Sequence, residues 1–384
     1  MEITIIELDY HAEVLRNLIL ILQETEIKFN IITRRKIWEK VNLKNDYPIF
    51  FIESYTNLNH LITKKSDIIK NVDIIFFNTI ASNFRYFYQL QTNAKIIVRV
   101  HNSYTFFSPK YHFTPTFFQL WKDTSHLVRK ELFELDWLFK KRFLNTVDFF
   151  SFPNQIFSQF AIHQDLIVPQ KVLLPCLPLT FFNPIPKQNN NSIRISIIGT
   201  IDQRRRNYKM LLSSLYHLDN QIDFPIIITL LGEGKGVMGK IILNKFKKQN
   251  LKNIKVETFN DFVPNDKFES ILSETILLLS PIHQKTKFNI YTEEYGRTKI
   301  SGSINDMIKY GIPILIPDFY PTSTELNQIV FKYHETPNLL ATKIKESIIS
   351  IQQKDLNFNE ILKNYSKNKI SSDFLKSITK IVKK

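Results

Sequence analysis

The sequence predicts an α/β protein made of two doubly wound, Rossmann-like domains, and three observations lead to this prediction. The chain has 384 residues, more than the roughly 150 that one compact domain usually takes. Short runs rich in Ile, Val and Phe alternate with amphipathic segments of helical period. A segment without periodicity, residues 183–192 with two prolines, separates two such series.

The N-terminal half contains seven apolar runs that each end in polar residues. Continuous apolar runs of this kind suit parallel strands that are covered on both faces of a sheet. Helices are expected between them, over 11–23, 124–144 and around 153–160. The expected strands are 2–8, 27–33, 49–52, 72–78, 95–100, 147–152 and 172–175.

The C-terminal half repeats the same alternation after residue 192. The expected strands are 193–199, 225–232, 255–259, 276–280 and 313–316, and the expected helices are 208–218, 239–249, 266–273, 303–310 and a tail from 337. The predicted division is therefore an N-terminal domain over 1–182, a linker over 183–192 and a C-terminal domain over 193–362. A basic helix over 363–384 can pack back on the N-terminal domain.

The composition narrows the class of protein. Hydrophobic residues make up 43% of the chain and charged residues 23%, as in globular proteins. Neither a signal peptide nor an apolar run of about 20 residues is seen, so we expect a cytoplasmic protein, at most peripheral at the inner face of the membrane. The single cysteine, Cys176, excludes an intramolecular disulfide and a zinc site built from several thiolates.

The net charge of +15 fits three kinds of partner: nucleic acid, an anionic membrane surface or an anionic small substrate. The basic and aromatic segment 124–144 and the lysine-rich tail allow weak contact with anionic lipid. An aromatic core face backed by a solvated basic face explains the same residues. No nucleic-acid-binding motif is found, so binding to RNA or DNA is not expected.

A phosphate site is predicted at the start of the helix expected over 303–310. Ser301, Gly302 and Ser303 leave backbone N–H groups available there, and a helix N-terminus attracts anions. Lys299 and Arg297 add positive charge just before it. The alternative is that the serines only cap the helix.

A second cationic loop follows the first strand of the C-terminal half. Gly199 and Thr200 end this strand, and the loop that follows contains Arg204 and Arg206. In a doubly wound sheet, ligands bind outside the carboxyl ends of the strands, where such cations can contact an anionic ligand. A solvated arginine run is the alternative.

Residues 293–317 resemble the C-terminal motif of GT-B glycosyltransferases of family 4, in which an acidic residue and an aromatic-Gly pair precede a helix ending in Gly-x-Pro. Asp306, five residues before Gly311, stands where that family places the glutamate that holds the ribose. The resemblance makes Glu293 the candidate for the family's first glutamate, although the interval from Glu293 to Asp306 is longer than the family's.

Other landmarks of the family follow in order. The loop with Arg204 and Arg206 is similar to the loop of the family's donor domain in which a basic pair neutralises the departing diphosphate. Gly232 resembles the glycine turn after the third strand, and Phe262 and Val263 lie in a segment that resembles the loop near the nucleobase. In the N-terminal half, His101 is similar to the histidine that the family places over the donor sugar, where it would donate to a sugar hydroxyl. His11 lies after the first strand, where some inverting GT-B enzymes carry a catalytic base. Each histidine could equally serve the structure alone.

The resemblance implies the GT-B architecture, with two domains facing a cleft, and a hexosyltransferase that uses a UDP- or GDP-sugar. It implies transfer to a saccharide, lipid-linked or protein acceptor with retention of configuration, in bacterial surface polysaccharide or glycoconjugate synthesis. No Asp-x-Asp pair is seen, so neither a metal nor a cofactor is expected. The alternatives are a sugar-nucleotide epimerase on the same scaffold and a basic nucleic-acid-binding protein.

Overall fold

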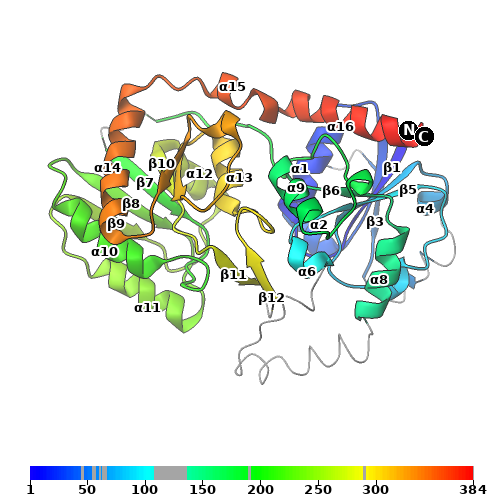
Figure 1. Ribbon diagram of the computed structural model, residues 1–384, viewed down its shortest axis with the longest axis horizontal. Coiled ribbons are helices and arrows are strands. Elements are labelled where there is room, and N and C mark those ends of the chain that lie inside the picture. Colours follow the sequence, from blue (N-terminus) through cyan, green and yellow to red (C-terminus); the bar gives the residue numbers. More distant parts are fainter. Residues whose placement is uncertain are drawn as a thin grey trace. The chain divides into compact units, whose positions relative to one another are not determined.

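The computed structural model describes residues 1–44, 47–53, 58–59, 62, 67–107, 136–188, 192–288 and 291–383. The chain forms two compact units. The first unit contains residues 1–180, 289–292 and 367–384, and the second contains 181–288 and 293–366. Each unit has a six-stranded sheet with helices along it (Figure 1).

The sheet of the first unit is parallel throughout and has the order β3-β2-β1-β4-β5-β6. Its strands are β1 (Glu2–Glu7), β2 (Lys28–Thr33), β3 (Ile49–Phe51), β4 (Ile74–Thr79), β5 (Lys95–Arg99) and β6 (Phe149–Ser151). The described helices around it are α1 (Ala12–Leu22), α2 (Arg35–Val41), α4 (Asp67–Lys70), α5 (Phe84–Phe87), α6 (Ser103–Phe107), α8 (Asp136–Thr146), α9 (Gln155–His163), η3 (Pro169–Lys171) and α16 (Lys367–Val382).

The sheet of the second unit is also parallel, in the order β14-β13-β10-β7-β8-β9. Its strands are β7 (Ile193–Ile198), β8 (Ile226–Leu231), β9 (Ile254–Thr258), β10 (Thr275–Leu279), β13 (Ile314–Pro317) and β14 (Val330–Tyr333). Its helices are α10 (Tyr208–Asp219), α11 (Gly236–Lys247), α12 (Asn265–Glu274), α13 (Gly302–Tyr310), η4 (Thr324–Leu326), α14 (Pro337–Gln353), α15 (Phe358–Ile361) and η5 (Lys363–Tyr365).

Both faces of the second sheet are buried, which explains its continuous apolar strands. Ile195 and Ile197 of β7 belong to one core cluster, whereas Ile198 belongs to the cluster on the other face. Leu277 and Leu278 of β10 divide in the same way. Successive side chains of a strand point to opposite faces, so a sheet covered on both sides favours apolar residues along the whole strand. The doubly wound fold predicted from the sequence is thereby confirmed.

One expected strand is wrong. Residues 172–175 make only an isolated bridge, Phe150 with Val172, beside β6. Leu173 N donates to Phe150 O and Leu177 N donates to Phe152 O. Pro175 lies between these two bonds and has no N–H to donate, so a regular ladder cannot continue through it.

Residues 183–188 of the expected linker are hydrogen-bonded to the second unit. Asn183 N donates to Lys309 O at 2.8 Å, and Gln188 N donates to Ser273 O at 3.1 Å. The ammonium of Lys187 donates to the carbonyl of Thr275 at 3.1 Å, and burial lowers its pKa to about 8. The unit boundary falls two residues earlier than expected, at Thr180.

Helix α16 belongs to the first unit although it ends the chain. Phe374 meets Phe76 of β4 edge to face, with ring centroids 5.9 Å apart. The Ser371 hydroxyl donates to the carbonyl of Ile21 in α1. The apolar side of α16 is therefore covered by its own unit.

The basic segment expected to be helical over 124–144 is only partly described. Helix α8 begins at Asp136, and residues 124–135 lie outside the described residues. No helix in the described part of the chain is both long and apolar enough to cross a membrane.

Candidate functional site

The switch point of the second sheet lies between β7 and β10. From β7 the chain continues to β8 and β9 on one side, and it then returns to β10 on the other. Ligands of doubly wound sheets bind outside the carboxyl ends of the strands at this point. The loops after β7 and β10 are joined there by hydrogen bonds from Asn207 N to Pro281 O and from His283 N to Arg205 O. The predicted arginine loop therefore has a defined conformation at the expected place.

The loop after β7 depends on two glycines that touch. A Cβ at Gly232 would lie 2.3 Å from the carbonyl oxygen of Gly199, so only glycine allows this approach. Gly199 has φ +98°, in the region that favours glycine. Two hydrogen bonds from Arg206 brace the same turn, from Nη2 to Ile198 O at 2.7 Å and from Nη1 to Thr200 O at 3.0 Å.

Arg204 is exposed and bound to Asp202. Its Nε and Nη2 donate to the two carboxylate oxygens of Asp202 at 3.0 and 2.9 Å. Burial raises the pKa of Asp202, but these hydrogen bonds and the charge of Arg204 outweigh it, so the pKa is lowered overall. The carboxylate already neutralises part of the Arg204 charge, whereas Arg206 braces the backbone.

Lys299 and Glu293 lie together near the start of α13. Glu293, in β12 (Tyr291–Glu294), is fully buried, and Lys299 follows a tight turn in which its N–H donates to Glu294 O. Burial lowers the pKa of Lys299 to about 8; Glu293 opposes this shift, and the charge of Arg205 adds to it. Arg205, which the sequence analysis did not select, therefore belongs to this charged cluster. Only its place in the arginine run could have indicated it.

Helix α13 begins where the phosphate site was predicted. Ser301 is the N-cap residue, and its side chain caps no backbone N–H of this described helix. Ser303 is 2% exposed, and its hydroxyl has no hydrogen-bond partner among the described residues. Gly302 is exposed, and Asp306 is half-buried one turn further on. The interpretation of the serines as caps alone therefore does not account for the side chains of Ser301 and Ser303.

The two residues expected near the nucleobase have different surroundings. Phe262 is 74% exposed, so its ring is accessible for stacking. Val263 is 8% exposed and packs in the core with Leu231 and Leu272. Of the two side chains, only that of Phe262 is open to a base.

In the first unit the two predicted histidines lie face to face. The imidazoles of His11 and His101 stack with centroids 4.0 Å apart and planes 12° apart. His11 precedes α1 and His101 follows β5, so the fold brings together residues 90 positions apart in the sequence. The sequence analysis selected each histidine separately, and no feature of the sequence indicated that they would meet.

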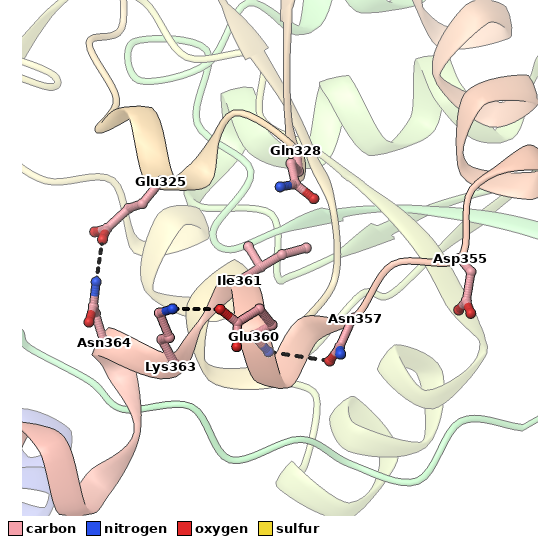
Figure 2. Close-up of a pocket in the computed structure, with 8 residues that line it drawn as sticks. All are labelled: Glu325, Gln328, Asp355, Asn357, Glu360, Ile361, Lys363 and Asn364. Atoms are coloured by element: carbon pink, nitrogen blue, oxygen red, sulfur yellow. Dashed lines mark hydrogen bonds and ion pairs between the residues drawn. The ribbon is translucent and has the colours of Figure 1, made fainter.

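A hollow of about 280 Å³ on the second unit contains none of the predicted site residues (Figure 2). Several of its polar side chains are held by neighbours in the hollow: Lys363 pairs with Glu360, and the Asn364 amide donates to Glu325. Helix α15 and its neighbours line it. It therefore contributes nothing to the site described above.

No protein-family model matches this sequence, and no curated protein matches it. Solved structures do match over the full length. The pneumococcal O-GlcNAc transferase GtfA, in complex with UDP and GlcNAc, covers 100% of this chain and 99% of its own, with 9% identity and a TM-score of 0.59. The lipopolysaccharide outer core galactosyltransferase WaaB covers 99% and 100%, with 12% identity and a TM-score of 0.57.

The fold is the two-domain GT-B fold. A proposed UDP-N-acetylglucosamine 2-epimerase from Listeria monocytogenes shares it as well, covering 99% of this chain and 96% of its own with 10% identity and a TM-score of 0.52. At these identities the similarity establishes the architecture alone. The choice between reactions depends on the residues of the site.

The contact between Gly199 and Gly232 predicts a test of the loop. Gly232→Ala should lower the free energy of unfolding by about 1–3 kcal/mol or more, because its Cβ would overlap a backbone carbonyl. Gly302→Ala should change it by less than about 1 kcal/mol, because a Cβ there meets no atom within 4 Å. Urea unfolding of both variants measures the difference, and equal losses would contradict the assigned packing.

Proposed function

We propose that the chain is a glycosyltransferase that uses a nucleoside diphosphate sugar, UDP- or GDP-linked, and transfers the sugar to an acceptor hydroxyl. The observation that carries this proposal is the cluster at the switch point of the second sheet. It combines a glycine-lined turn, the start of α13 and the cations Lys299 and Arg205. These are the groups that bind a diphosphate.

The charged cluster suits a leaving diphosphate in particular. Negative charge develops on the diphosphate as the bond to the sugar breaks, and fixed cations stabilise that charge more in the transition state than in the ground state. Burial is the main cause of the lowered pKa of Lys299, and repulsion by Arg205 adds to it. An anion placed beside both cations would offset that repulsion.

The remaining roles follow from the same arrangement. Asp306, one turn into α13, would hold the ribose, and the exposed Phe262 would stack on the base. A role for His11 and His101 in the reaction is proposed as well. We further propose retention of configuration without a metal, because Lys299 and Arg205 can supply the charge that a metal supplies elsewhere. A role in surface polysaccharide or glycoconjugate synthesis would fit such an enzyme.

A sugar-nucleotide epimerase is the second candidate, because a proposed enzyme of that class has the same fold over the whole chain. It would need the same diphosphate site. The two functions differ in the fate of the sugar: an epimerase inverts a ring carbon and needs no acceptor, whereas a transferase breaks the bond to the diphosphate and passes the sugar on.

Ligand-dependent melting tests the diphosphate site. UDP or GDP at a hundredfold its dissociation constant should stabilise the chain by about 2.7 kcal/mol, or roughly 5–10 °C in a thermal scan. Lys299→Met should abolish most of the shift, because the cation beside the diphosphate is lost. Lys245→Met removes an equal charge from exposed α11 and should leave the shift intact. No shift with UDP, GDP, ADP or CMP would exclude the proposed site.

The pKa of Lys299 predicts how nucleotide binding depends on pH. Lys299 is charged below about pH 8 and loses its proton as the pH rises through that value. The diphosphate keeps its charge from about pH 7 to about 9.5, because its last ionisation lies near 6. Affinity for UDP should therefore fall about tenfold across this range, and calorimetric titration measures it. The Lys299→Met variant should bind weakly and show little pH dependence, and an unchanged wild-type affinity would contradict the role of Lys299.

A further inference from the structure

A row of buried polar side chains crosses the first sheet beneath the histidine pair. Glu7, Asn78, Arg99 and Ser151 stand at or next to the carboxyl ends of β1, β4, β5 and β6, and each is at most 2% exposed. The register pairs Arg99 directly with Ser151, so these two side chains share a face. Isolated polar groups buried this deeply are costly, which makes their connections informative.

Glu7 lies at one end of this row, on β1, and connects the row to the loop that leads to His11. One oxygen, Oε1, accepts the N–H groups of Asp9 at 3.0 Å and Tyr10 at 3.2 Å, which hold the loop leading to His11. The other, Oε2, accepts from the Asn78 amide at 2.6 Å, and the Asn78 oxygen accepts from Arg99 Nη1 at 2.9 Å. Burial raises the pKa of Glu7, and hydrogen bonds from Thr79, Asn78 and the Asp9 backbone oppose that rise.

Asn78 and Thr79 of β4, which both hydrogen-bond to Glu7, also contact His101. Its Nε2 lies 2.8 Å from the carbonyl oxygen of Asn78 and 3.2 Å from the hydroxyl of Thr79. A carbonyl oxygen can only accept, so Nε2 carries the proton. In the neutral ring, Nδ1 is then the basic atom.

We propose that Glu7 is a positioning residue for the His11–His101 pair. Through Thr79 and Asn78 it fixes His101 in the Nε2–H form, and through the N–H groups of Asp9 and Tyr10 it fixes the loop that carries His11. The histidine pair held in this way takes part in the proposed transfer reaction. The last step rests on the proposed function, whereas the positioning itself is a property of the first unit.

The hydrogen-bond pattern allows a double substitution that separates the effect of the hydrogen bonds of Glu7 from the effect of its negative charge. In Glu7→Gln the new amide NH₂ faces the NH₂ of Asn78, and turning the Asn78 amide would place its NH₂ against Arg99. In the double variant E7Q/N78D, the amide introduced on β1 donates to the carboxylate introduced on β4, and that carboxylate still accepts from Arg99. The bonds among positions 7, 78 and 99 and those to the N–H groups of Asp9 and Tyr10 are restored, and the buried negative charge moves from position 7 to position 78.

The test combines kinetics with ¹⁵N NMR of histidine-labelled protein at about pH 8, above the ordinary histidine pKa of about 6.5. His101→Gln assigns the His101 ring among the nine histidines. Glu7→Gln should lower kcat at least tenfold with little change in KM, and it should shift the ring signal away from the Nε2–H form. The double variant should restore kcat to within about threefold of the wild-type value. It should also return the His101 ring signal to the Nε2–H form. An unchanged ring signal in Glu7→Gln, or a double variant no better than the single one, would overturn the proposal.

A matched pair of threonine substitutions tests the proposal if the Glu7→Gln variant does not fold. Thr79→Val removes the hydroxyl that contacts His101, whereas Thr4→Val removes a similarly buried hydroxyl, bonded to Asn30 at 2.8 Å in the same sheet. Only Thr79→Val should change the His101 signal, and equal effects would overturn the proposal. The NMR measurement needs no turnover, so it tests the positioning separately from the proposed function. If the proposed function fails, nucleotide binding and kcat are zero, and the ring signals still report the positioning.

Discussion

Burial of both sheet faces is the constraint on which the rest of this structure depends. A parallel strand covered on both sides has no exposed side along its length, so polar side chains that must meet a ligand can gather only where the strand ends. Both sheets follow this rule. The first ends its strands in Glu7, Asn78 and Arg99, and the second ends β7 in a glycine turn with the arginine run behind it. The candidate site residues of both units therefore lie at or next to strand ends.

Each unit holds its functional groups by a different physical means. In the second unit, backbone contact holds the loop, because Gly199 and Gly232 touch and Arg206 bonds the carbonyls on either side. In the first unit, a buried carboxylate does so by accepting from two loop N–H groups and from Asn78. Backbone contacts suit a site that must fit around phosphate, whereas side-chain bonds can select one form of a titratable ring.

Much of the fold was predictable because alternation, apolar runs and breaks are local properties of the sequence. The strands of the two six-stranded sheets, apart from β14, lie within a few residues of the predicted ones, and the predicted strand 172–175 does not form because Pro175 cannot donate to a ladder. Strand β14 and helix α2 were not predicted, since Val330–Tyr333 is short and Arg35–Val41 carries little helical pattern of its own. The attachment of residues 183–188 to the second unit depends on contacts with Lys309 and Ser273, which are remote in sequence.

The candidate site was predictable in its positions but not in its partners. Strand ends and helix starts marked Gly199, Ser301, His11 and His101 for attention, because those positions follow from local pattern. The stacking of the two histidines, the binding of Arg204 by Asp202 and the place of Arg205 beside Lys299 all depend on how loops fold over the sheet. No periodicity in the sequence encodes such contacts.

The products of a sugar nucleotide incubated with the protein alone would test glycosyl transfer most directly. Transferases pass sugar slowly to water when no acceptor is present, so NMR of UDP- and GDP-sugars should show the free nucleoside diphosphate and a sugar released with the anomeric configuration of the donor. A sugar nucleotide that keeps its diphosphate and changes configuration at a ring carbon would contradict the account and identify an epimerase.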